Sequence, residues 1–360
     1  MSEYMIRAIE LAKKGEGFVN PNPLVGAVIV KNNKIIGEGY HTRYGCLHAE
    51  REAIKSLKET AKGADMYVTL EPCCHHGTNP PCTEAVIESG IKRVFVGSSD
   101  PNPLVAGKGA RQLKNAGIEV IEHYLKEECD KLNDIFFHYI TTKTPYVILK
   151  TAITADGKTA CANGDSKWIT NDMSRYNVHK TRKKCAAILT GIGTVLADNP
   201  ILNCRCENPS NPIRVICDSN LKIPMDCNIV KTANDIKTIV ATISDNQEKT
   251  KLLTASGIEV IKTKSKDNRV DITDLMLKLG ERKIDSVLVE AGATLNASII
   301  NAKMVNQLDI YIAPKLIGDF NSMPFLADIN VKNMSEAYML KSPQIKTFGD
   351  DVLISYKVGE

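Results

Sequence analysis

Three short segments of this sequence carry side chains that bind zinc in proteins, and a chain that uses them together must fold so that they meet. His48 stands two residues before Glu50 at the start of a helical pattern, and two Pro-Cys pairs supply Cys73 and Cys82. One imidazole and two thiolates can hold zinc with a fourth position open for water, which is the layout of a catalytic site. The stretch from residue 48 to residue 82 therefore predicts a catalytic zinc site.

The position of Glu50 indicates the chemistry of such a site. It is near enough to the metal to transfer protons but is not itself a ligand, as in the zinc nucleobase deaminase pattern H-x-E…P-C-x-x-C. Eight residues separate Cys73 from Cys82 here, where that pattern has two. Cys74 could replace Cys73 as a ligand, but Cys73 follows the proline and Cys74 occupies the variable position. A closed structural zinc site, with a fourth protein ligand, is the alternative that Glu50 as a non-ligand argues against.

The loop at residues 71–82, EPCCHHGTNPPC, identifies a family. It resembles the deaminase half of the bifunctional deaminase/reductase family of riboflavin biosynthesis, whose usual form is EPC-x-H-x-G-x-T-PPC. The chain departs from this form at Thr78-Asn79, where the family has a basic residue followed by Thr. The resemblance implies a cytidine-deaminase-like α/β/α domain over residues 1–144. It also implies hydrolytic deamination of 2,5-diamino-6-(5-phosphoribosylamino)pyrimidin-4(3H)-one.

Segments on either side of this loop look like the pyrimidine-holding segments of the same family. They are NPNP-x-VG, GYH and DPNP, which contain Asn22, His41 and Asn102. Amide and imidazole groups suit this task, because a polar base edge left unpaired in a buried site is costly. His75 is expected to face substrate because three protein ligands already suffice for the metal. The resemblance thus implies Asn22, His41, His75 and Asn102 as substrate contacts.

The rest of the first half alternates strand and helix patterns, which predicts a mostly parallel sheet with helices on its faces. In such a sheet, active groups gather at the carboxyl ends of strands, where Cys73 falls. We expect helices at 2–14, 82–89 and 107–116, strands at 24–30, 35–40, 66–70, 93–96 and 118–122, and a helical stretch over 122–144.

The second half resembles the reductase half of the family. KTAITADGKTA…GDSKWIT and GxGTVLADNP carry this likeness, which implies a dihydrofolate-reductase-like α/β domain over residues 145–360 and NADPH as cofactor. A Rossmann site at Gly191-x-Gly193 is disfavoured, because the third glycine and the later acidic residue of that motif are missing. We expect a helix over 171–184 and strands over 146–150 and 186–190.

A stronger glycine site follows the strand expected at 284–289. Backbone N–H groups at the helix start after Gly292 can hold a pyrophosphate, and Glu290 is placed to bind substrate hydroxyls beside the nicotinamide. The resemblance implies cofactor contacts from Ala152, Trp168, Thr194, Asp198, Gly292, Ala293, Thr294, Leu295, Asn296, Ala297 and Ser298. It implies reductase substrate contacts from Ser166, Arg182, Leu202, Arg205 and Glu290.

Composition excludes several other classes of protein. A net charge of +4 and 5% aromatic residues argue against a nucleic-acid-editing deaminase, the alternative function, because that would need a basic, aromatic groove. No apolar run reaches the length of a membrane span, and the first residues lack a signal-peptide core. Eleven cysteines without disulfide-scaffold spacing fit a reduced, cytoplasmic setting. The family suggests a homodimer or homotetramer.

Overall fold

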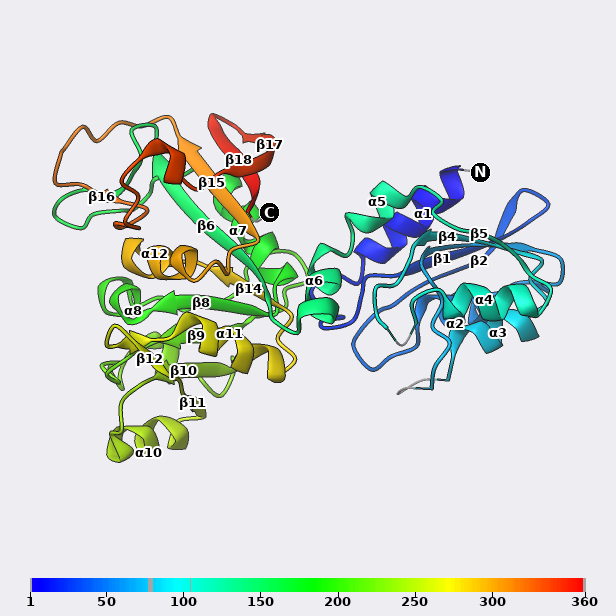
Figure 1. The fold of residues 1–360 in the computed structure, drawn as a ribbon, viewed down its shortest axis with the longest axis horizontal. Coiled ribbons are helices and arrows are strands. Elements are labelled where there is room, and N and C mark those ends of the chain that lie inside the picture. The colour runs from blue at the N-terminus through cyan, green and yellow to red at the C-terminus, as the bar shows by residue number, and fades with distance from the viewer. Residues whose placement is uncertain (1, 77–79, 104, 359–360) are drawn as a thin grey trace. The chain divides into compact units, whose positions relative to one another are not determined.

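The computed structural model describes residues 2–76, 80–103 and 105–358. The chain divides into two compact units, Met1–Lys143 and Thr144–Glu360, each built around its own sheet (Figure 1). The predicted α/β class is confirmed for both. Thr78-Asn79, where the sequence departs from the family form, lies outside the described residues. Within the described ranges, no helix has the length and apolar character needed to cross a membrane.

The first unit has a five-stranded sheet in the order β2-β1-β3-β4-β5. The sheet is mixed: β3, β4 and β5 are parallel, whereas β1 runs antiparallel to both β2 and β3. The strands are β1 Gly26–Lys31, β2 Lys34–Tyr40, β3 Asp65–Leu70, β4 Arg93–Ser98 and β5 Glu119–Ile121. The helices are α1 Ser2–Lys13, α2 Ala49–Lys55, α3 Cys82–Glu88, α4 Lys108–Asn115, α5 Lys126–Asp130 and α6 Asp134–Thr142.

Helices cover both faces of this sheet, which gives the predicted α/β/α layers (Figure 1). Alternate strand residues face opposite layers: Ile29 belongs to the core cluster that includes residues of α2, α3 and α4, whereas Val28 belongs to the cluster that includes residues of α1 and α5. The expectation of one helical stretch over 122–144 is wrong, since α5 and α6 are separate. Between them, buried Asn133 uses its amide on the backbone of Leu24, accepting from its N–H at 2.8 Å and donating to its carbonyl at 3.0 Å.

A glycine in β2 lets α2 approach the sheet. A Cβ atom at Gly39 would lie 2.2 Å from the Ala53 backbone nitrogen and 2.5 Å from the Ala49 carbonyl oxygen. Any side chain there would therefore push α2 away. Because His48 caps the start of α2, this contact also sets where His48 stands relative to the sheet.

The second unit has a nine-stranded sheet in the order β11-β10-β9-β8-β14-β6-β15-β18-β17. Strands from β11 to β15 are parallel, and β18 and β17 add an antiparallel hairpin. Its strands are β6 Tyr146–Thr154, β8 Ala187–Gly191, β9 Ile213–Cys217, β10 Thr238–Thr242, β11 Ile258–Lys262, β14 Ser286–Val289, β15 Gln307–Ala313, β17 Leu340–Phe348 and β18 Asp351–Val358.

The helices of this unit also flank the sheet. Leu189 of β8 packs in the cluster that contains α11 and α12, whereas its neighbour Ile188 packs in the cluster that contains α8, α9 and α10. The helices are α7 Asp172–Lys184, α8 Ile192–Asp198, α9 Asn228–Lys231, α10 Gln247–Ala255, α11 Ile272–Glu281, α12 Ala293–Asn301 and the 3₁₀ turn Met334–Glu336. Short strand pairs β7 Lys158–Ala160 with β16 Met323–Pro324, and β12 Ser265–Lys266 with β13 Arg269–Val270, complete the unit.

Arg214 of β9 is a fully buried guanidinium in the core of this unit, with 0% of its surface exposed. Each of its three nitrogens donates to neutral oxygens, so its hydrogen-bonding capacity is used without a carboxylate. The partners are Thr238 Oγ1 at 2.9 Å, Thr232 Oγ1 at 2.7 Å and the carbonyls of Ile201, Ile229 and Ile236 at 3.1, 2.9 and 3.0 Å. Arg214 therefore ties the segment at Ile201 to α9, to the segment that follows α9 and to the start of β10.

We expect Arg214→Lys to lower the free energy of unfolding by about 2–4 kcal/mol, because one ammonium cannot reach oxygens spread around a planar guanidinium. Arg269→Lys, at an exposed position of the same unit, should change it by less than about 0.5 kcal/mol. Denaturant unfolding followed by the fluorescence of Trp168, the single Trp of the sequence, measures the stability of this unit. Equal stabilities of the two variants would contradict the role assigned to Arg214.

Candidate active sites

The three residues predicted to bind metal meet in the first unit. His48 precedes α2, Cys73 lies in the segment after β3, and Cys82 opens α3. His48 Nδ1 lies 3.4 Å from the Sγ atom of each cysteine, and all three candidate ligand atoms lie within 4.8 Å of one another. Tertiary folding thus brings together a set that spans 35 residues of sequence (48–82).

This cluster fits a tetrahedral zinc ion. Zn–S bonds of about 2.3 Å and Zn–N bonds of about 2.0–2.1 Å at tetrahedral angles place S and N roughly 3.6 Å apart. The two observed S···N separations of 3.4 Å are close to that value. The Cys82 thiol and backbone N–H both donate toward Cys73, which lowers the pKa of Cys73, whereas the same contact raises that of Cys82. The pair therefore gives up its first proton readily, and a divalent cation would favour loss of the second.

Glu50 occupies the first turn of α2 beside these ligands. Its side chain is buried, with 3% of the residue exposed, and it lies outside the group of candidate ligand atoms found among the described residues. Burial raises the pKa of Glu50 to about 7, with the negative charge at Cys73 acting in the same direction. A nearby cation would lower that pKa again. The carboxyl group is thus placed to exchange a proton without being needed for coordination.

Asn22 and His41 form a hydrogen-bonded pair next to the candidate metal ligands. Asn22 Nδ2 lies 3.1 Å from His41 Nε2, and His41 Nδ1 lies 3.0 Å from the Leu47 carbonyl oxygen. Burial lowers the pKa of His41, so the neutral ring donates from Nδ1 and accepts at Nε2. The His41 and His48 rings meet edge to face with centroids 5.4 Å apart. The structure therefore brings two of the predicted substrate residues to the metal cluster.

The other two predicted substrate residues lie in loops after β3 and β4. His75 Nδ1 is buried and has no hydrogen-bond partner in the part of the chain that the structure describes, which suits an atom that meets a ligand. Asn102 is half-buried, and its backbone N–H donates to Asp100 Oδ1 at 2.8 Å. Burial raises the pKa of Asp100 to about 6.

A second polar cluster lies at the carboxyl end of β14 in the other unit. Arg182 of α7 donates to both oxygens of Glu290, at 2.6 and 3.0 Å, and to the Asn203 carbonyl at 2.9 Å. Lys150 Nζ lies 3.8 Å from Glu290 Oε2. Burial raises the pKa of Glu290, but Arg182 and Lys150 outweigh it and hold that pKa at about 2. Burial in turn lowers the pKa of Lys150.

Lys150 was not among the predicted site residues. It follows four buried residues of β6, Tyr146–Leu149, and a lysine at the end of such an apolar run is the signal that could have found it. Sequence alone gives the place of Lys150 on β6. It does not show that Lys150 faces the carboxylate of Glu290, 140 residues later.

The segment with Leu202 and Arg205 is fixed to α7 by His179. His179 Nδ1 accepts from the Arg205 backbone N–H at 3.2 Å, and the Cys204 thiol donates to the His179 carbonyl at 3.3 Å. Burial, reinforced by the charges of Arg182 and Arg205, lowers the pKa of His179 to about 4. Leu202 is buried and the Arg205 side chain is exposed.

The glycine segments predicted to bind cofactor lie at neighbouring strand ends. β8 and β14 are adjacent and parallel, and a Cβ at Gly191 would lie 3.5 Å from Leu295 Cδ2. Thr190 Oγ1, at the end of β8, is buried with no partner among the described atoms, so a polar ligand could satisfy it. The positions on α8 and α12 differ in exposure: Thr194, Asp198, Gly292, Ala293, Thr294, Leu295 and Ser298 reach the surface at least in part, and Asn296 and Ala297 are buried.

Trp168 is placed on the surface of its unit. It is 62% exposed, and the Arg175 guanidinium lies over its ring, 4.5 Å from the centroid. Lys315 Nζ donates to the Trp168 carbonyl at 2.5 Å, and Lys167 Nζ lies 3.9 Å from Asp198 Oδ1. Of the remaining predicted residues, Ser166 and Ala152 are half-buried, and Ala152 packs beside Tyr311.

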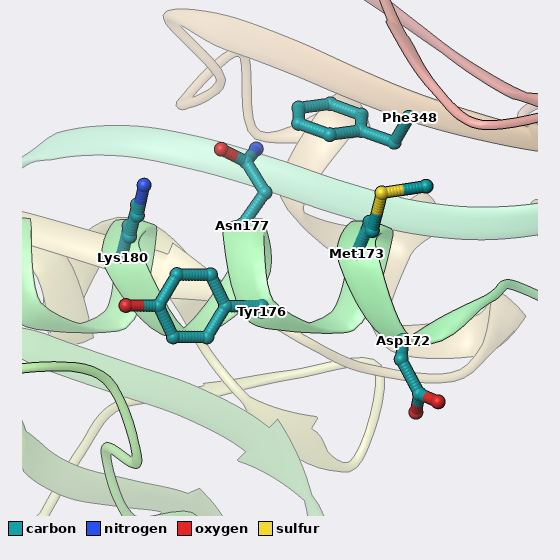
Figure 2. Close-up of a pocket in the computed structure, with 6 residues that line it drawn as sticks. All are labelled: Asp172, Met173, Tyr176, Asn177, Lys180 and Phe348. Carbon is teal, nitrogen blue, oxygen red and sulfur yellow. The ribbon is translucent and has the colours of Figure 1, made fainter.

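A pocket of about 390 Å³ opens on α7 (Figure 2). Met173 and Asn177 point toward Phe348, with Tyr176 and Lys180 on the same stretch of helix, while Asp172 points away. These helix residues recur at three- and four-residue spacing, so Arg182 falls on a different face of α7. The pocket is therefore separate from the Glu290 cluster.

Comparisons with known proteins match each of the two units to a known domain. Residues 1–98 match the cytidine and deoxycytidylate deaminase zinc-binding region, and residues 145–354 match the RibD C-terminal domain. Riboflavin biosynthesis protein RibD of Actinobacillus pleuropneumoniae is 52% identical over 99% of this chain and 95% of its own, and RibD of Escherichia coli K12 is 38% identical over 98% and 97%.

Solved structures also match this chain over nearly its full length. Acinetobacter baumannii RibD has 37% identity and a TM-score of 0.90, with 99% of this chain and 98% of that chain covered. A diaminohydroxyphosphoribosylaminopyrimidine deaminase/5-amino-6-(5-phosphoribosylamino)uracil reductase from Thermotoga maritima has 39% identity and a TM-score of 0.85, with the same coverage.

We expect Cys82→Ser to lower bound zinc well below one ion per chain, because a serine hydroxyl replaces a thiolate ligand. Cys74→Ser is the matched control, since it changes the adjacent thiol in the Cys73 loop, and it should keep zinc. Elemental analysis of both purified variants measures this. If instead the Cys74 variant loses the metal and the Cys82 variant keeps it, the assignment of His48, Cys73 and Cys82 as the ligands is wrong.

The lowered pKa of His179 predicts a pH effect on the second unit. An unfolded histidine takes up a proton below about pH 6.5, whereas the folded one resists until about pH 4, so the stability that neutral His179 provides is lost as pH falls through this window. The unfolding free energy should drop by up to about 3 kcal/mol more in the wild type than in His179→Asn. Denaturant titrations at several pH values from 7 to 4 test this prediction. If the unfolding free energies of the two proteins fall equally with pH, the prediction is refuted.

Proposed function

Because the chain belongs to the RibD family of bifunctional deaminase/reductases of riboflavin biosynthesis, we propose that its two polar clusters are the two active sites. The observation that carries the proposal is the meeting of His48, Cys73 and Cys82 beside a buried glutamate that is not a ligand. The nucleic-acid-editing alternative is not favoured, since both halves match the biosynthetic family over the whole length of the chain.

At the first site, we assign His48, Cys73 and Cys82 to one zinc ion with an open coordination position. Zinc held there supplies the Lewis acidity that lets water act as a nucleophile at neutral pH. Glu50 accepts the first proton of that water and delivers it to the pyrimidine ring; it then takes the proton of the newly added hydroxyl group and delivers it to the amino group, which leaves as ammonia while the carbonyl forms. The Asn22–His41 pair, His75 and Asn102 bind the polar edge of 2,5-diamino-6-(5-phosphoribosylamino)pyrimidin-4(3H)-one.

At the second site, the ribosyl group of the deaminated product is reduced to ribityl with NADPH, which supplies the hydride. Glu290, ionised by its contacts with Arg182 and Lys150, accepts hydrogen bonds from substrate hydroxyls. Burial lowers the pKa of the Lys150 ammonium. We assign Lys150 as the donor of the proton that accompanies hydride transfer. Ser166, Arg182, Leu202 and Arg205 complete the substrate site.

The cofactor is assigned to the ends of β8 and β14. Backbone N–H groups at the starts of α8 and α12 favour phosphate there. Side-chain or backbone contacts are assigned to Ala152, Trp168, Thr194, Asp198 and the residues from Gly292 to Ser298. Asn296 and Ala297 are buried residues of α12, and they support the start of that helix from inside the unit.

We also propose a cytoplasmic enzyme that forms a homodimer or homotetramer. All eleven cysteines are free thiols, as expected in a reducing compartment. Leu316, Phe320, Met334 and Met339 are large apolar side chains that are mostly exposed, which supports burial against another copy. Size-exclusion chromatography with light scattering distinguishes these oligomers from a monomer.

The two sites should be chemically independent, which a crossed pair of variants tests. Glu50→Gln should keep zinc and lose deamination by at least about 10²–10⁴-fold, because proton transfer is removed, yet still oxidise NADPH with the deaminated ribosyl compound. Glu290→Gln should deaminate normally and reduce that compound roughly ten- to hundredfold more slowly. Products are identified by mass, and reduction by NADPH absorbance.

The design separates two failures. If zinc-loaded Glu50→Gln no longer oxidises NADPH on the deaminated compound, a single composite site replaces the model of two sites. If Glu50→Gln loses its zinc, Glu50 belongs to the coordination shell, and its role as proton carrier is rejected.

A further inference from the structure

Glu71 has a buried carboxylate that neither of the two proposed reactions uses. It stands between the end of β3 and the Pro72-Cys73 pair, with 5% of the residue exposed. Glu71 Oε2 accepts from the Gly107 backbone N–H at 3.0 Å, and Oε1 accepts from the Ala110 N–H at 3.1 Å. Both donors belong to the start of α4. A carboxylate two residues before the proposed metal ligand Cys73 therefore caps a helix that begins more than thirty residues later.

The backbones of the two segments are also in close contact. A Cβ atom at Gly109 would lie 2.1 Å from the Pro72 carbonyl oxygen, so only glycine allows this approach. The Glu71 N–H donates to the Ser98 carbonyl at 2.9 Å, at the end of β4. The start of α4 is thus held against the segment that carries Cys73 by side-chain bonds and by backbone contact.

Asn102 lies between these two anchored points. Its N–H donates to Asp100 Oδ1 at 2.8 Å, and its carbonyl accepts from the N–H groups of Val105 and Ala106 at 2.8 and 2.9 Å. Val105 is buried, with 1% exposed. Two hydrogen bonds therefore join the backbone of Asn102 to Val105 and Ala106, next to Gly107, and Gly107 is held by Glu71.

We propose that Glu71 is a positioning residue of the deaminase site, which sets the place of Asn102 relative to the metal ligand Cys73. The inference rests on the proposed function, in which Asn102 binds the pyrimidine. A carboxylate is required because both oxygens must accept hydrogen bonds from backbone donors. Glutamine offers one acceptor, and its NH₂ group would face an N–H group of α4.

Glu71→Gln should raise KM for the diaminopyrimidinone phosphate roughly tenfold while kcat changes less than about threefold, because misplaced binding contacts act equally on substrate and transition state. Zinc should stay at one ion per chain, and NADPH-dependent reduction of the deaminated compound should be unchanged. A purely structural role would lower zinc or stability without this split between KM and kcat.

A double-mutant cycle tests whether Glu71 acts through Asn102. In Asn102→Ala protein, the added Glu71→Gln change should lower kcat/KM by less than about twofold, since the group that it positions is already gone. Glu84→Gln is the matched control: this half-buried glutamate of the same unit pairs with His76, 3.5 Å away, and its change should leave KM as in the wild type.

Each outcome decides the proposal. A wild-type KM in Glu71→Gln, full additivity with Asn102→Ala, or loss of zinc from Glu71→Gln would each overturn it. Wild-type protein that does not deaminate the pyrimidine would overturn the proposed function, and this inference with it. Active wild-type protein with an unaffected Glu71→Gln variant would reject the role of Glu71 alone.

Discussion

Burying an ionisable side chain costs several kcal/mol unless partners lie within hydrogen-bonding distance, and both units are arranged around such partners. Arg182 and Glu290 meet through two hydrogen bonds across 108 residues of sequence. Arg214 has its donors matched by carbonyl and hydroxyl oxygens from neighbouring segments. In each case, the segments that supply the partners are fixed by the need to satisfy one buried group.

The two candidate active sites use this constraint in opposite ways. At the Glu290 cluster, two cations hold the carboxylate ionised, which suits a group that accepts hydrogen bonds from hydroxyls throughout a reaction. At the His48 cluster, burial and the negative charge at Cys73 outweigh the opposing effect of His48 and raise the pKa of Glu50 to about 7, which suits a group that takes and gives a proton. The local environment, not the residue type, separates the roles that we propose for the two glutamates.

Close backbone approach positions the deaminase site. Gly39 lets α2 lie against β2, and Gly109 lets α4 touch the Pro72 carbonyl. His48 immediately precedes α2, and Asn102 lies shortly before α4, so small changes at either glycine would move a proposed metal ligand or a proposed substrate contact. The glycines thus contribute geometry to a site in which they do no chemistry.

The sequence by itself determined the chemistry that we propose for the first site. The order of His48, Glu50, Cys73 and Cys82, and the strand and helix patterns around them, are local features that can be read along the chain. It also placed Glu290 and the glycine segment at the end of a strand. It did not identify Lys150, His179 or Glu71, because nothing in their own neighbourhoods shows which distant group each meets.

Only the tertiary structure decided those pairings. Lys150 and Glu290 lie on β6 and at the end of β14, and Glu71 reaches donors 36 and 39 residues away. It also split the stretch at 122–144 into two helices, since the Asn133 amide bonds to the backbone of Leu24. The physical reason is the same throughout: a buried polar group takes whichever partner folding brings near, and that choice depends on packing between segments far apart in sequence.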